Sequence, residues 1–345
     1  MSVFVIAEAG VNHNGDAEHA LEMVDVAARA GADAIKFQTF SADKLVSHQA
    51  EKAEYQKRET GEGGQHAMLK ALEMSDALHE ALVARCARAN IEFMSTPFDE
   101  DAADMLVALG IRRIKVPSGE ITNHPFLRHL AGKDLPLIVS TGMATLAEIV
   151  DALAVIGRAR EAHGLAAPLE EVVTVLHCTS NYPAEPGDVN LRAMQTIAVE
   201  TGMPVGYSDH TLGLAVSTAA VAMGAQIVEK HFTLDRTLPG PDHRASLTPG
   251  EMTRLIAQIR TVEAALGSPV KAPTDAELPV RAVARRSVAA ARDLSAGTML
   301  TRGDVTLLRP GTGIAPTHID EIGGRTLARA IAQGTPLTWD DLASA

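Results

Sequence analysis

Short apolar runs recur along the chain, each bounded by polar residues or glycine and separated from the next by a helix-length stretch. Eight such runs begin at Val3, Asp33, Ile91, Arg112, Leu135, Val172, Pro204 and Ala225. They do not alternate in polarity, which is typical of strands buried on both faces. Between them, segments such as 17–31 carry apolar residues at spacings of three and four, as amphipathic helices do. The pattern predicts strands and helices in strict alternation.

Eight strands with helical crossovers predict an α/β fold, a (β/α)8 TIM barrel, and a doubly wound open sheet is the alternative. No G-x-G-x-x-G follows the first run, where an open nucleotide-binding sheet would place it. Polar residues also cluster where the runs end, as Glu8, Lys36, Ser140 and His231 do. A barrel gathers all eight strand ends around one mouth, whereas an open sheet spreads them along an edge. The barrel is therefore favoured, over residues 1–267.

A second, smaller unit follows the barrel. Residues 268–285 hold three prolines and indicate a linker arm. Residues 286–345 are short segments punctuated by glycine, without a long amphipathic helix. They predict a compact β-rich module of about 60 residues, close to the lower limit for independent folding.

Composition and charge narrow the class of protein. With 31 basic and 43 acidic residues the net charge is −12, which disfavours a nucleic-acid partner. Two cysteines provide neither a disulfide framework nor a cysteine-rich metal site. No apolar stretch reaches the ~18 residues of a membrane-spanning helix, and the opening residues lack the features of a signal peptide. A cytoplasmic protein without a membrane partner is expected.

Two histidines, His210 and His231, each close one of two consecutive strand-like runs. In a barrel both imidazoles emerge at the same rim, close enough to hold one divalent cation. With additional oxygen ligands they suit Mn²⁺, an Mg²⁺-like ion or Zn²⁺. The alternative is that both are packed or surface histidines. His13 and His243 are interpreted as hydrogen-bonding loop residues.

Two lysines, Lys36 and Lys115, lie inside apolar strand sequence, where an unpaired ammonium is costly to bury. With nearby serine hydroxyls they indicate a site for a small phosphorylated or carboxylated ligand. The alternative is a structural network in which each lysine pairs with a carboxylate such as Glu8 or Glu120. Glu120 and Asp242 follow strands four and eight, in loops placed to contact substrate hydroxyls.

Several long strings then carry a family resemblance: IAEAGVNHNG, GADAIKFQTF, STPFDE, KVPSGEITN, STGMATLAEI, HCTSNYPA, GYSDHTLG, VEKHFTLDRTLPGPDH and RPGTGI. From Val3 to the C-terminal module the chain resembles the sialic acid (nonulosonate) synthase family. Members of that family join a (β/α)8 barrel to an antifreeze-like (SAF) domain. They condense phosphoenolpyruvate with an N-acetylated aminosugar aldehyde and release phosphate.

The resemblance implies roles for particular residues. It makes His210 and His231 ligands of a divalent metal, with Mn²⁺ preferred and Mg²⁺ or Co²⁺ as alternatives. It implies phosphoenolpyruvate contacts for Lys36, Thr96, Lys115, Ser118, Ser140 and Ser208, and sugar contacts for Glu8, Gln38, Glu120, Tyr182 and Asp242. Ser180 stands where family members often have asparagine, and Asn181 follows it, so the resemblance leaves the phosphate role open between the two. The expected catalytic residues are Glu120, Glu8, Lys115 and Arg309, with Glu120 as the proton-handling group.

The resemblance also implies an assembly. Arg309 in RPGTGI matches an arginine that reaches from the SAF domain of one subunit toward the sugar in the barrel of its partner. A domain-swapped homodimer is therefore expected. Without the resemblance, Arg309 reads as a surface residue before a Pro-Gly turn.

The first expectation for the reaction is N-acetylmannosamine as acceptor, giving N-acetylneuraminate. The alternative is a diacetamido-trideoxyhexose that gives N,N'-diacetyllegionaminate. A different phosphoenolpyruvate–aldose condensing enzyme would need a second phosphate site, and the sequence has no arginine-rich cluster to supply it. The readings from other classes are a surface-binding antifreeze module and a sugar-binding protein without turnover.

Overall fold

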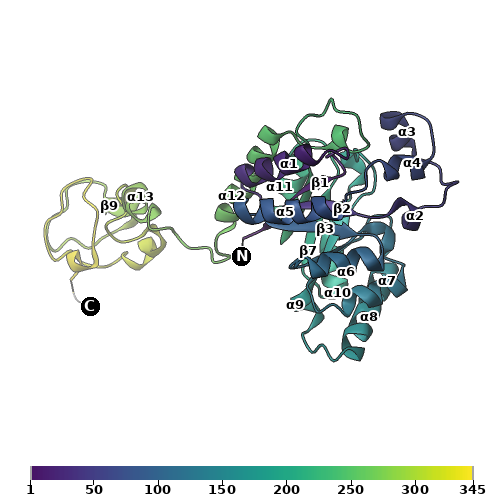
Figure 1. The fold of residues 1–345 in the computed structure, drawn as a ribbon. Coiled ribbons are helices and arrows are strands. Elements are labelled where there is room, and N and C mark those ends of the chain that lie inside the picture. Colours follow the sequence, from purple (N-terminus) through teal and green to yellow (C-terminus); the bar gives the residue numbers. More distant parts are fainter. Residues whose placement is uncertain (1, 344–345) are drawn as a thin grey trace. The chain divides into compact units, whose positions relative to one another are not determined.

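The chain forms two compact units, Met1–Gly267 and Ser268–Ala345. The structure is a computed structural model and describes residues 2–343. The first unit is built from eight parallel strands with helices between them (Figure 1). This confirms the predicted α/β class and the (β/α)8 barrel.

The eight strands fall within the eight predicted runs. They are β1 Phe4–Gly10, β2 Ala34–Thr39, β3 Glu92–Pro97, β4 Ile114–Val116, β5 Leu137–Ser140, β6 Val173–Cys178, β7 Val205–Asp209 and β8 Ile227–His231. Their order is β3-β2-β1-β8-β7-β6-β5-β4. β1 pairs in parallel with both β2 and β8, so the first and last strands are neighbours. β3 and β4 lie side by side and complete the ring, although no ladder joins them among the described residues.

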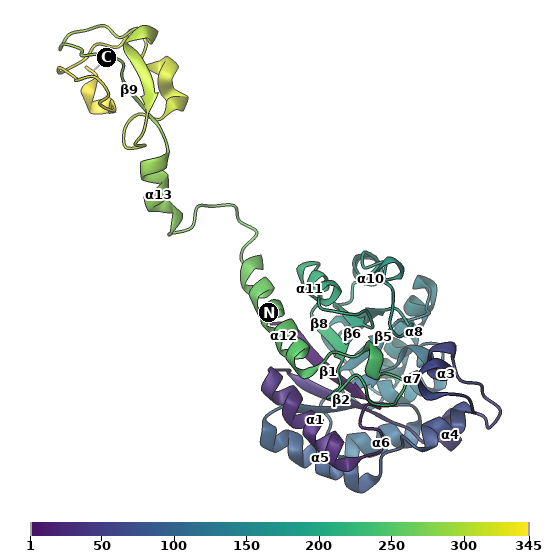
Figure 2. The same ribbon diagram turned by 90° about the horizontal axis from the view of Figure 1, so that it is seen from above.

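Helices surround the strands (Figure 2). They are α1 Ala17–Ala30, α5 Asp76–Ala89, α6 Glu100–Ala108, α7 His124–Ala131, α8 Leu146–Ala162, α9 Leu169–Val172, α10 Ala193–Thr201, α11 Ala215–Ala222 and α12 Pro249–Leu266. α1 shows how the sequence sets their bounds. The Asp16 carboxylate accepts a hydrogen bond from the His19 amide at its start, and Gly31 at φ 87° ends it in the left-handed region. Its apolar stripe is buried against the barrel.

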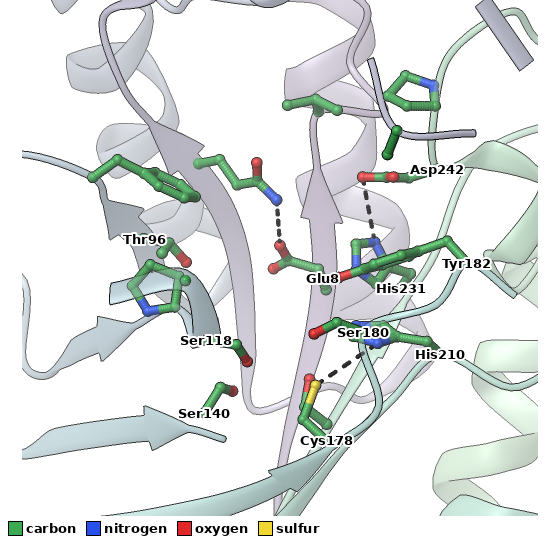
Figure 3. A pocket seen from close by; sticks show the side chains of 18 of the residues that line it. Glu8, Thr96, Ser118, Ser140, Cys178, Ser180, Tyr182, His210, His231 and Asp242 are labelled. Atoms are coloured by element: carbon green, nitrogen blue, oxygen red, sulfur yellow. Dashed lines mark hydrogen bonds and ion pairs between the residues drawn. The ribbon is translucent and has the colours of Figure 1, made fainter. Parts of the chain in front are cut away.

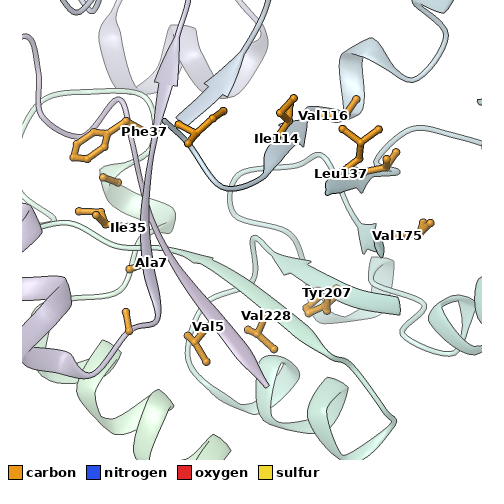
Figure 4. Packing of buried hydrophobic residues seen from close by; sticks show 14 of the residues in the cluster. Val5, Ala7, Ile35, Phe37, Ile114, Val116, Leu137, Val175, Tyr207 and Val228 are labelled. Atoms are coloured by element: carbon orange, nitrogen blue, oxygen red, sulfur yellow. The ribbon is translucent and has the colours of Figure 1, made fainter. Parts of the chain in front are cut away.

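The hydrophobic core has two layers because each strand is covered on both sides. The larger layer lies between strands and helices and includes Val5, Ile35, Val116 and Val228 (Figure 4). A smaller cluster contains Ile6, Ala34, Met94, Ile138, Leu176 and Ile227, each from a strand. Since side chains alternate along a strand, these residues point to the barrel interior and fill it. Polar residues further along the same strands then face the mouth.

Residues 40–75 depart from the simple alternation of strand and helix. Three short helices, α2 Ala42–Leu45, α3 Glu54–Thr60 and α4 Gln65–Lys70, precede α5. They carry apolar residues that join a separate cluster with Val11, Phe40 and Phe98. We refer to residues 53–72 as the cover, because they line the cavity at the barrel mouth.

The second unit has its own core. β9 Ser287–Ala290 pairs antiparallel with β10 Val305–Leu308, and isolated bridges join the remaining segments. Buried residues such as Val288, Leu300 and Leu337 form its centre. The predicted compact β-rich module is therefore confirmed. The segment predicted as a linker contains the helix α13 Glu277–Ala284, and the Gly311 amide donates to the Ala282 carbonyl at 2.7 Å. That part of the arm thus contacts the module.

Among the described helices, none combines the length and apolar composition that a membrane crossing requires.

Candidate active site

A cavity of about 500 Å³ opens at the carboxyl ends of the barrel strands (Figure 3). Thirteen of the fifteen residues predicted for the site line it: Glu8, Lys36, Gln38, Thr96, Lys115, Ser118, Ser140, Ser180, Tyr182, Ser208, His210, His231 and Asp242. They come from all eight strands or from the loops that directly follow them. The register of the strands brings some of these residues together, because Glu8 on β1 stands opposite both Lys36 on β2 and His231 on β8.

The deepest part of the cavity is a network of four buried charges. Lys36 Nζ lies 2.7 Å from Glu8 Oε2 and 3.7 Å from Glu229 Oε1, and Lys115 Nζ lies 3.2 Å from the same Glu229 oxygen. Lys36 also donates to Thr96 Oγ1 at 2.8 Å. The pairing of Lys36 with Glu8 is the one that the sequence offered as an alternative. The partner of Lys115, however, is Glu229 and not Glu120.

The two carboxyl groups of this network differ in their ionisation. Burial raises the pKa of Glu8 to about 7, although Lys36 beside it acts to lower the pKa. Burial also acts to raise the pKa of Glu229, but Lys115 and Lys36 together lower it to about 2. Glu229 therefore remains an anion that holds two ammonium groups. Glu8 exchanges a proton near neutral pH, as a general acid or base must.

Hydroxyl groups gather beside the two lysines. Gly142, just after β5, allows this, because a Cβ there would lie 2.1 Å from Ser180 Oγ and 2.9 Å from Ser118 Oγ. Its amide donates to Ser118 Oγ at 2.9 Å. Ser140 Oγ is buried and has no hydrogen-bond partner among the described residues. Ammonium groups, hydroxyls and a backbone amide in one place are the donors that an anion such as a phosphate or a carboxylate requires.

The structure distinguishes Ser180 from Asn181. Ser180 lines the cavity, whereas Asn181 is exposed and its Oδ1 accepts from the Tyr182 amide at 3.1 Å. Of the two, Ser180 is the residue in position to contact a ligand.

The imidazoles of His210 and His231 lie side by side, with ring centroids 5.3 Å apart. His210 Nδ1 lies 2.7 Å from the Thr179 carbonyl oxygen, which only accepts, so Nδ1 carries the proton and the neutral ring presents a lone pair at Nε2. Burial acts to lower the pKa of His210, but Cys178 beside it raises the pKa above its usual value. His231 Nδ1 is buried without a hydrogen-bond partner in the described part of the chain, 4.0 Å from Asp242 Oδ2. Burial and the nearby positive groups hold the pKa of His231 well below its usual value, so the ring is neutral. These donor groups fit a divalent cation.

The pair does not by itself make a complete protein ligand set. Within residues 2–343, one group of three or more histidine, cysteine or acidic side chains has its ligand atoms within 4.8 Å of one another, and it is Asp43, His48 and His66. That group lies outside the cavity. A cation held by His210 and His231 would therefore take further ligands from substrate or water.

Aromatic rings connect the imidazoles to the cover. The ring of Tyr182 lies 4.0 Å from that of His210 and stands edge-on to His231 at 5.6 Å. On its other side it stacks with Tyr55 of α3 at 5.1 Å. The cover thus reaches the two imidazoles through Tyr182, which Tyr55 contacts.

Two predicted residues lie elsewhere. Glu120 lines a side chamber of about 270 Å³ that opens beside the cavity, and its Oε2 accepts from Asn123 Nδ2 at 2.6 Å. The expected placement beside Lys115 and Ser118 is not found, because the turn after β4 directs the Glu120 carboxylate away from them. Arg309 is an exposed residue of the second unit, directly after β10.

Sequence reasoning missed several cavity residues. Glu229 lies two positions before His231, so the period of a strand places both on one side, and this pattern was available. Cys178 is free and buried, and it also lines the cavity, with Sγ 3.8 Å from His210 Nδ1. One feature of the sequence, the long interval between the second and third strands, could have indicated the cover residues. These are Tyr55, Gln56, Gln65, Met68, Leu69 and Leu72.

His13 and His243 are hydrogen-bonding loop residues, as the sequence indicated. His13 Nδ1 accepts from the Gly15 amide at 3.0 Å. His243 bonds Thr233 Oγ1 at 2.7 Å and Asn14 Oδ1 at 3.1 Å.

Comparison with known proteins extends these observations. A model described as the NeuB family matches residues 23–271, and a SAF domain matches residues 285–343. The chain is 53% identical to the N,N'-diacetyllegionaminic acid synthase of Legionella pneumophila over 343 residues, which cover 99% of this chain and 95% of that protein. It is 42% identical to the synthase of the same name from Campylobacter jejuni, over 93% of this chain and 94% of that one.

A solved structure gives the same picture. The crystal structure of N-acetylneuraminic acid synthetase from Leptospira borgpetersenii, in complex with citrate, superimposes with a TM-score of 0.69 and 35% identity. The match covers 81% of this chain and 90% of that chain.

Proposed function

The chain belongs to the NeuB family, and from this premise we propose that it condenses phosphoenolpyruvate with a diacetamido-trideoxyhexose and water to give N,N'-diacetyllegionaminate and phosphate. The observation that carries the choice of acceptor is the 53% identity to a synthase of that product along nearly the whole chain. The motifs alone placed N-acetylmannosamine first. Identity to the Legionella and Campylobacter synthases reverses this order.

Phosphoenolpyruvate brings a carboxylate and a phosphate, and the cavity offers a matching set of donors. Lys36 and Lys115 supply the charge, while Ser118, Ser140 and Ser208 supply directional hydroxyls. Both lysines are buried beside Glu229, so their side chains are held in place before the ligand arrives. Fixed donors of this kind stabilise charge without reorganising during the reaction.

The proposed reaction forms one carbon–carbon bond and breaks one carbon–oxygen bond. The enol carbon C3 attacks the aldehyde carbon of the open-chain sugar, and the aldehyde oxygen takes a proton. Water adds to C2 and forms a new C–O bond there, while the C–O bond from C2 to the phosphate group breaks. The two protons of the water end on the aldehyde oxygen and on the departing phosphate. Glu8 is proposed as the group that transfers a proton at the aldehyde end, because its carboxyl group lies in the cavity with a pKa near neutrality. The cavity holds both reactants at reacting distance.

His210 and His231 are proposed to hold a divalent cation, preferably Mn²⁺. When bound, the ion supplies positive charge that polarises the aldehyde oxygen and helps to orient the sugar. The lone pair of His210 Nε2 and the unpartnered His231 Nδ1 support this assignment. Mn²⁺ is expected to raise the melting temperature of the unaltered protein, because it binds the folded chain and not the unfolded chain. His210→Asn should abolish that rise, and an undiminished rise would reject the site.

Arg309 and a domain-swapped homodimer remain a proposal that rests on the resemblance of RPGTGI to the family motif. The check is complementation between two inactive chains. Mixing an Arg309→Ala chain with a chain inactivated in the barrel should restore activity in hybrid dimers, whereas absence of activity there would show that each barrel uses its own arginine.

The proposed function is tested by phosphate release from phosphoenolpyruvate in the presence of Mn²⁺. The diacetamido-trideoxyhexose is expected to be the preferred acceptor, with N-acetylmannosamine weaker. Preference for N-acetylmannosamine would make the protein a sialic acid synthase. Binding of sugar without phosphate release would indicate a binding protein.

A further inference from the structure

The cover forms one wall of the cavity, and this wall differs chemically from the rest. Opposite it lie the lysines, serines and imidazoles of the barrel strands, which are charged or strongly polar. The cover and its immediate neighbours contribute the side chains Val11, Ala53, Tyr55, Gln56, Gln65, Met68, Leu69, Leu72 and Phe98. This wall therefore combines an apolar surface with two amides and one phenol, and the side chains that line the cavity here carry no charge.

We propose that the cover selects the acceptor sugar through the end of the sugar that lies far from the aldehyde. The apolar surface of the cover receives the terminal methyl group of the sugar, and the amides at the side chamber receive its second acetamido group. The inference rests on the proposed function, since it assigns residues to the two groups by which a diacetamido-trideoxyhexose differs from N-acetylmannosamine.

The apolar surface is a packed cluster and not a scatter of side chains. Val11, Phe40 and Leu72 are buried, and Met68, Leu69 and Phe98 pack against them with part of their surface still accessible. Phe40 and Phe98 meet edge to face at 6.0 Å, which fixes the base of the cluster. A methyl group placed on it loses contact with water, while a hydroxymethyl group there finds no strong hydrogen-bond partner among these side chains, because the Met68 thioether is only a weak acceptor.

The two amides lie at the opening of the side chamber. Gln65 Nε2 donates to Gln56 Oε1 at 3.4 Å, and the same Gln56 oxygen accepts from the Ala53 amide at 3.0 Å. The pair retains donor hydrogens on Gln56 Nε2 and an acceptor in Gln65 Oε1. An acetamido group carries one acceptor and one donor, so it complements this pair.

The side chamber supplies the room. Its volume of about 270 Å³ adjoins the cavity, and the two share Gln38, Gln56, Gln65, Leu69 and Phe98 as lining residues. Glu120 closes the chamber on the side of β4. This places a carboxylate, which only accepts, where the N–H of an acetamido group would also find a partner. Glu120 then contacts the sugar, as the resemblance implied, at its distal end.

The residues at the two ends of the cavity determine the orientation in which the sugar is proposed to bind. The aldehyde end belongs beside His210, His231 and Glu8, where the proton and metal chemistry is proposed. Gln38 Nε2 donates to Glu8 Oε1 at 3.4 Å, and Gln38 also lines the side chamber. A ligand that extends from Glu8 past Gln38 therefore reaches the cover with its distal end.

The experiment compares three acceptors by kcat/KM for phosphate release: N-acetylmannosamine, its terminally deoxygenated analogue, and the diacetamido-trideoxyhexose. The second acceptor differs from the first by the terminal methyl group, and the third differs from the second by the additional acetamido group. Met68→Gln makes the apolar surface polar at nearly constant side-chain length. It should lower the ratio of kcat/KM for the terminally deoxygenated analogue to that for N-acetylmannosamine by about 10-fold, the effect of one apolar group in a pocket. Gln65→Leu should lower the ratio between the third and second acceptors by a similar factor while leaving the first ratio within about twofold.

Matched variants keep the result interpretable. Met68→Leu retains an apolar side chain and should retain the wild-type ratios. Met223→Gln makes the same chemical change at a partly buried methionine outside the cavity and should alter neither ratio. If Met68→Gln and Gln65→Leu leave both ratios unchanged while the unaltered protein prefers the diacetamido sugar, the cover does not select the acceptor. If the unaltered protein releases phosphate with none of the three acceptors, the proposed function itself fails.

Discussion

Two buried networks of lysine and carboxylate lie on either side of one strand. β8 carries Glu229 and Lys230 in succession, and a strand directs successive side chains to opposite faces. On the outer side, Lys230 Nζ lies 2.9 Å from Asp209 Oδ2, and both side chains are fully buried. Asp209 also accepts from the Thr211 amide and hydroxyl and from Ser217 Oγ. On the inner side, Glu229 meets Lys36 and Lys115 in the cavity.

The two networks differ in how many polar atoms remain without a hydrogen-bond partner. Each outer charge has several protein partners, so that network is complete without a ligand. In the inner network Glu229 Oε2, Ser140 Oγ and His231 Nδ1 have no hydrogen-bond partner among the described residues. Unsatisfied buried polar groups are costly and uncommon, and those that line a cavity can be completed by a bound ligand. Similar residue types thus stabilise the fold on one side of a strand and prepare a binding site on the other.

The sharpest test of this difference is the same substitution on both sides. Lys115→Met is expected to lower kcat/KM for phosphoenolpyruvate by about 10³-fold, because it removes a buried charged partner of the ligand. The free energy of unfolding should change little, since Glu229 keeps Lys36 and Ser208 as partners. Lys230→Met is the matched control and should lower stability instead. A large loss of stability with unaltered kinetics in Lys115→Met would make the inner network structural as well.

Two carboxylates compete for the role of proton transfer. Glu8→Gln is expected to lower kcat by about 10²- to 10⁴-fold, because Glu8 lies in the inner network with a pKa near neutrality. Glu120→Gln should lower kcat by less than about 10-fold, since its carboxylate lies in the side chamber. Steady-state kinetics with saturating substrates measures both. The opposite order would return the role to Glu120, which the sequence favoured.

Breaking the outer network should act on stability. Asp209→Asn leaves Lys230 buried without a counter-charge and is expected to lower the free energy of unfolding by about 3–5 kcal/mol. Denaturant titration measures this change. Replacing both partners with apolar residues, Asp209→Leu with Lys230→Met, should cost less than either single change, because no uncompensated charge remains. A double variant less stable than both single variants would contradict this account.

The smallest expected effect concerns the unpartnered hydroxyl of Ser140. Ser140→Ala should raise KM for phosphoenolpyruvate by about 10-fold, the contribution of one hydrogen bond to a charged ligand. The melting temperature should stay the same or rise slightly, because a buried hydroxyl without a partner does not stabilise the fold. Ser217→Ala on the outer side should show the reverse, a lower melting temperature with unchanged KM. Equal effects on stability in both variants would remove the contrast between the networks.

The cavity residues that the sequence identified share one property. Each lies at or just beyond the carboxyl end of a recognisable strand, and a closed parallel barrel brings all such ends to one mouth. Strand period and barrel closure therefore explain why these thirteen residues gather at one cavity, although the family resemblance was needed to single out several of them, such as Tyr182. Ser180 could be preferred to Asn181 only when the fold showed which one faces the cavity.

The residues that the sequence missed or misplaced depend on contacts between distant segments. Glu120 follows its strand as predicted, yet a single turn directs its carboxylate into the side chamber and toward Asn123. Met68 and Leu69 on α4 pack with Val11 and Phe98, and Tyr55 on α3 stacks with Tyr182. No local periodicity encodes such packing.

The sequence by itself determined the alternation of strands and helices, the barrel and the rim on which the chemistry lies, because those follow from the periods of strand and helix and from the ends of parallel strands. Only the tertiary structure decided that Glu229 holds both lysines, that Glu8 and not Glu120 stands among them, and that the cover forms one wall of the cavity. Partner choice among buried charges depends on distances of a few ångströms between strands far apart in the chain, and these distances exist only once the barrel has closed.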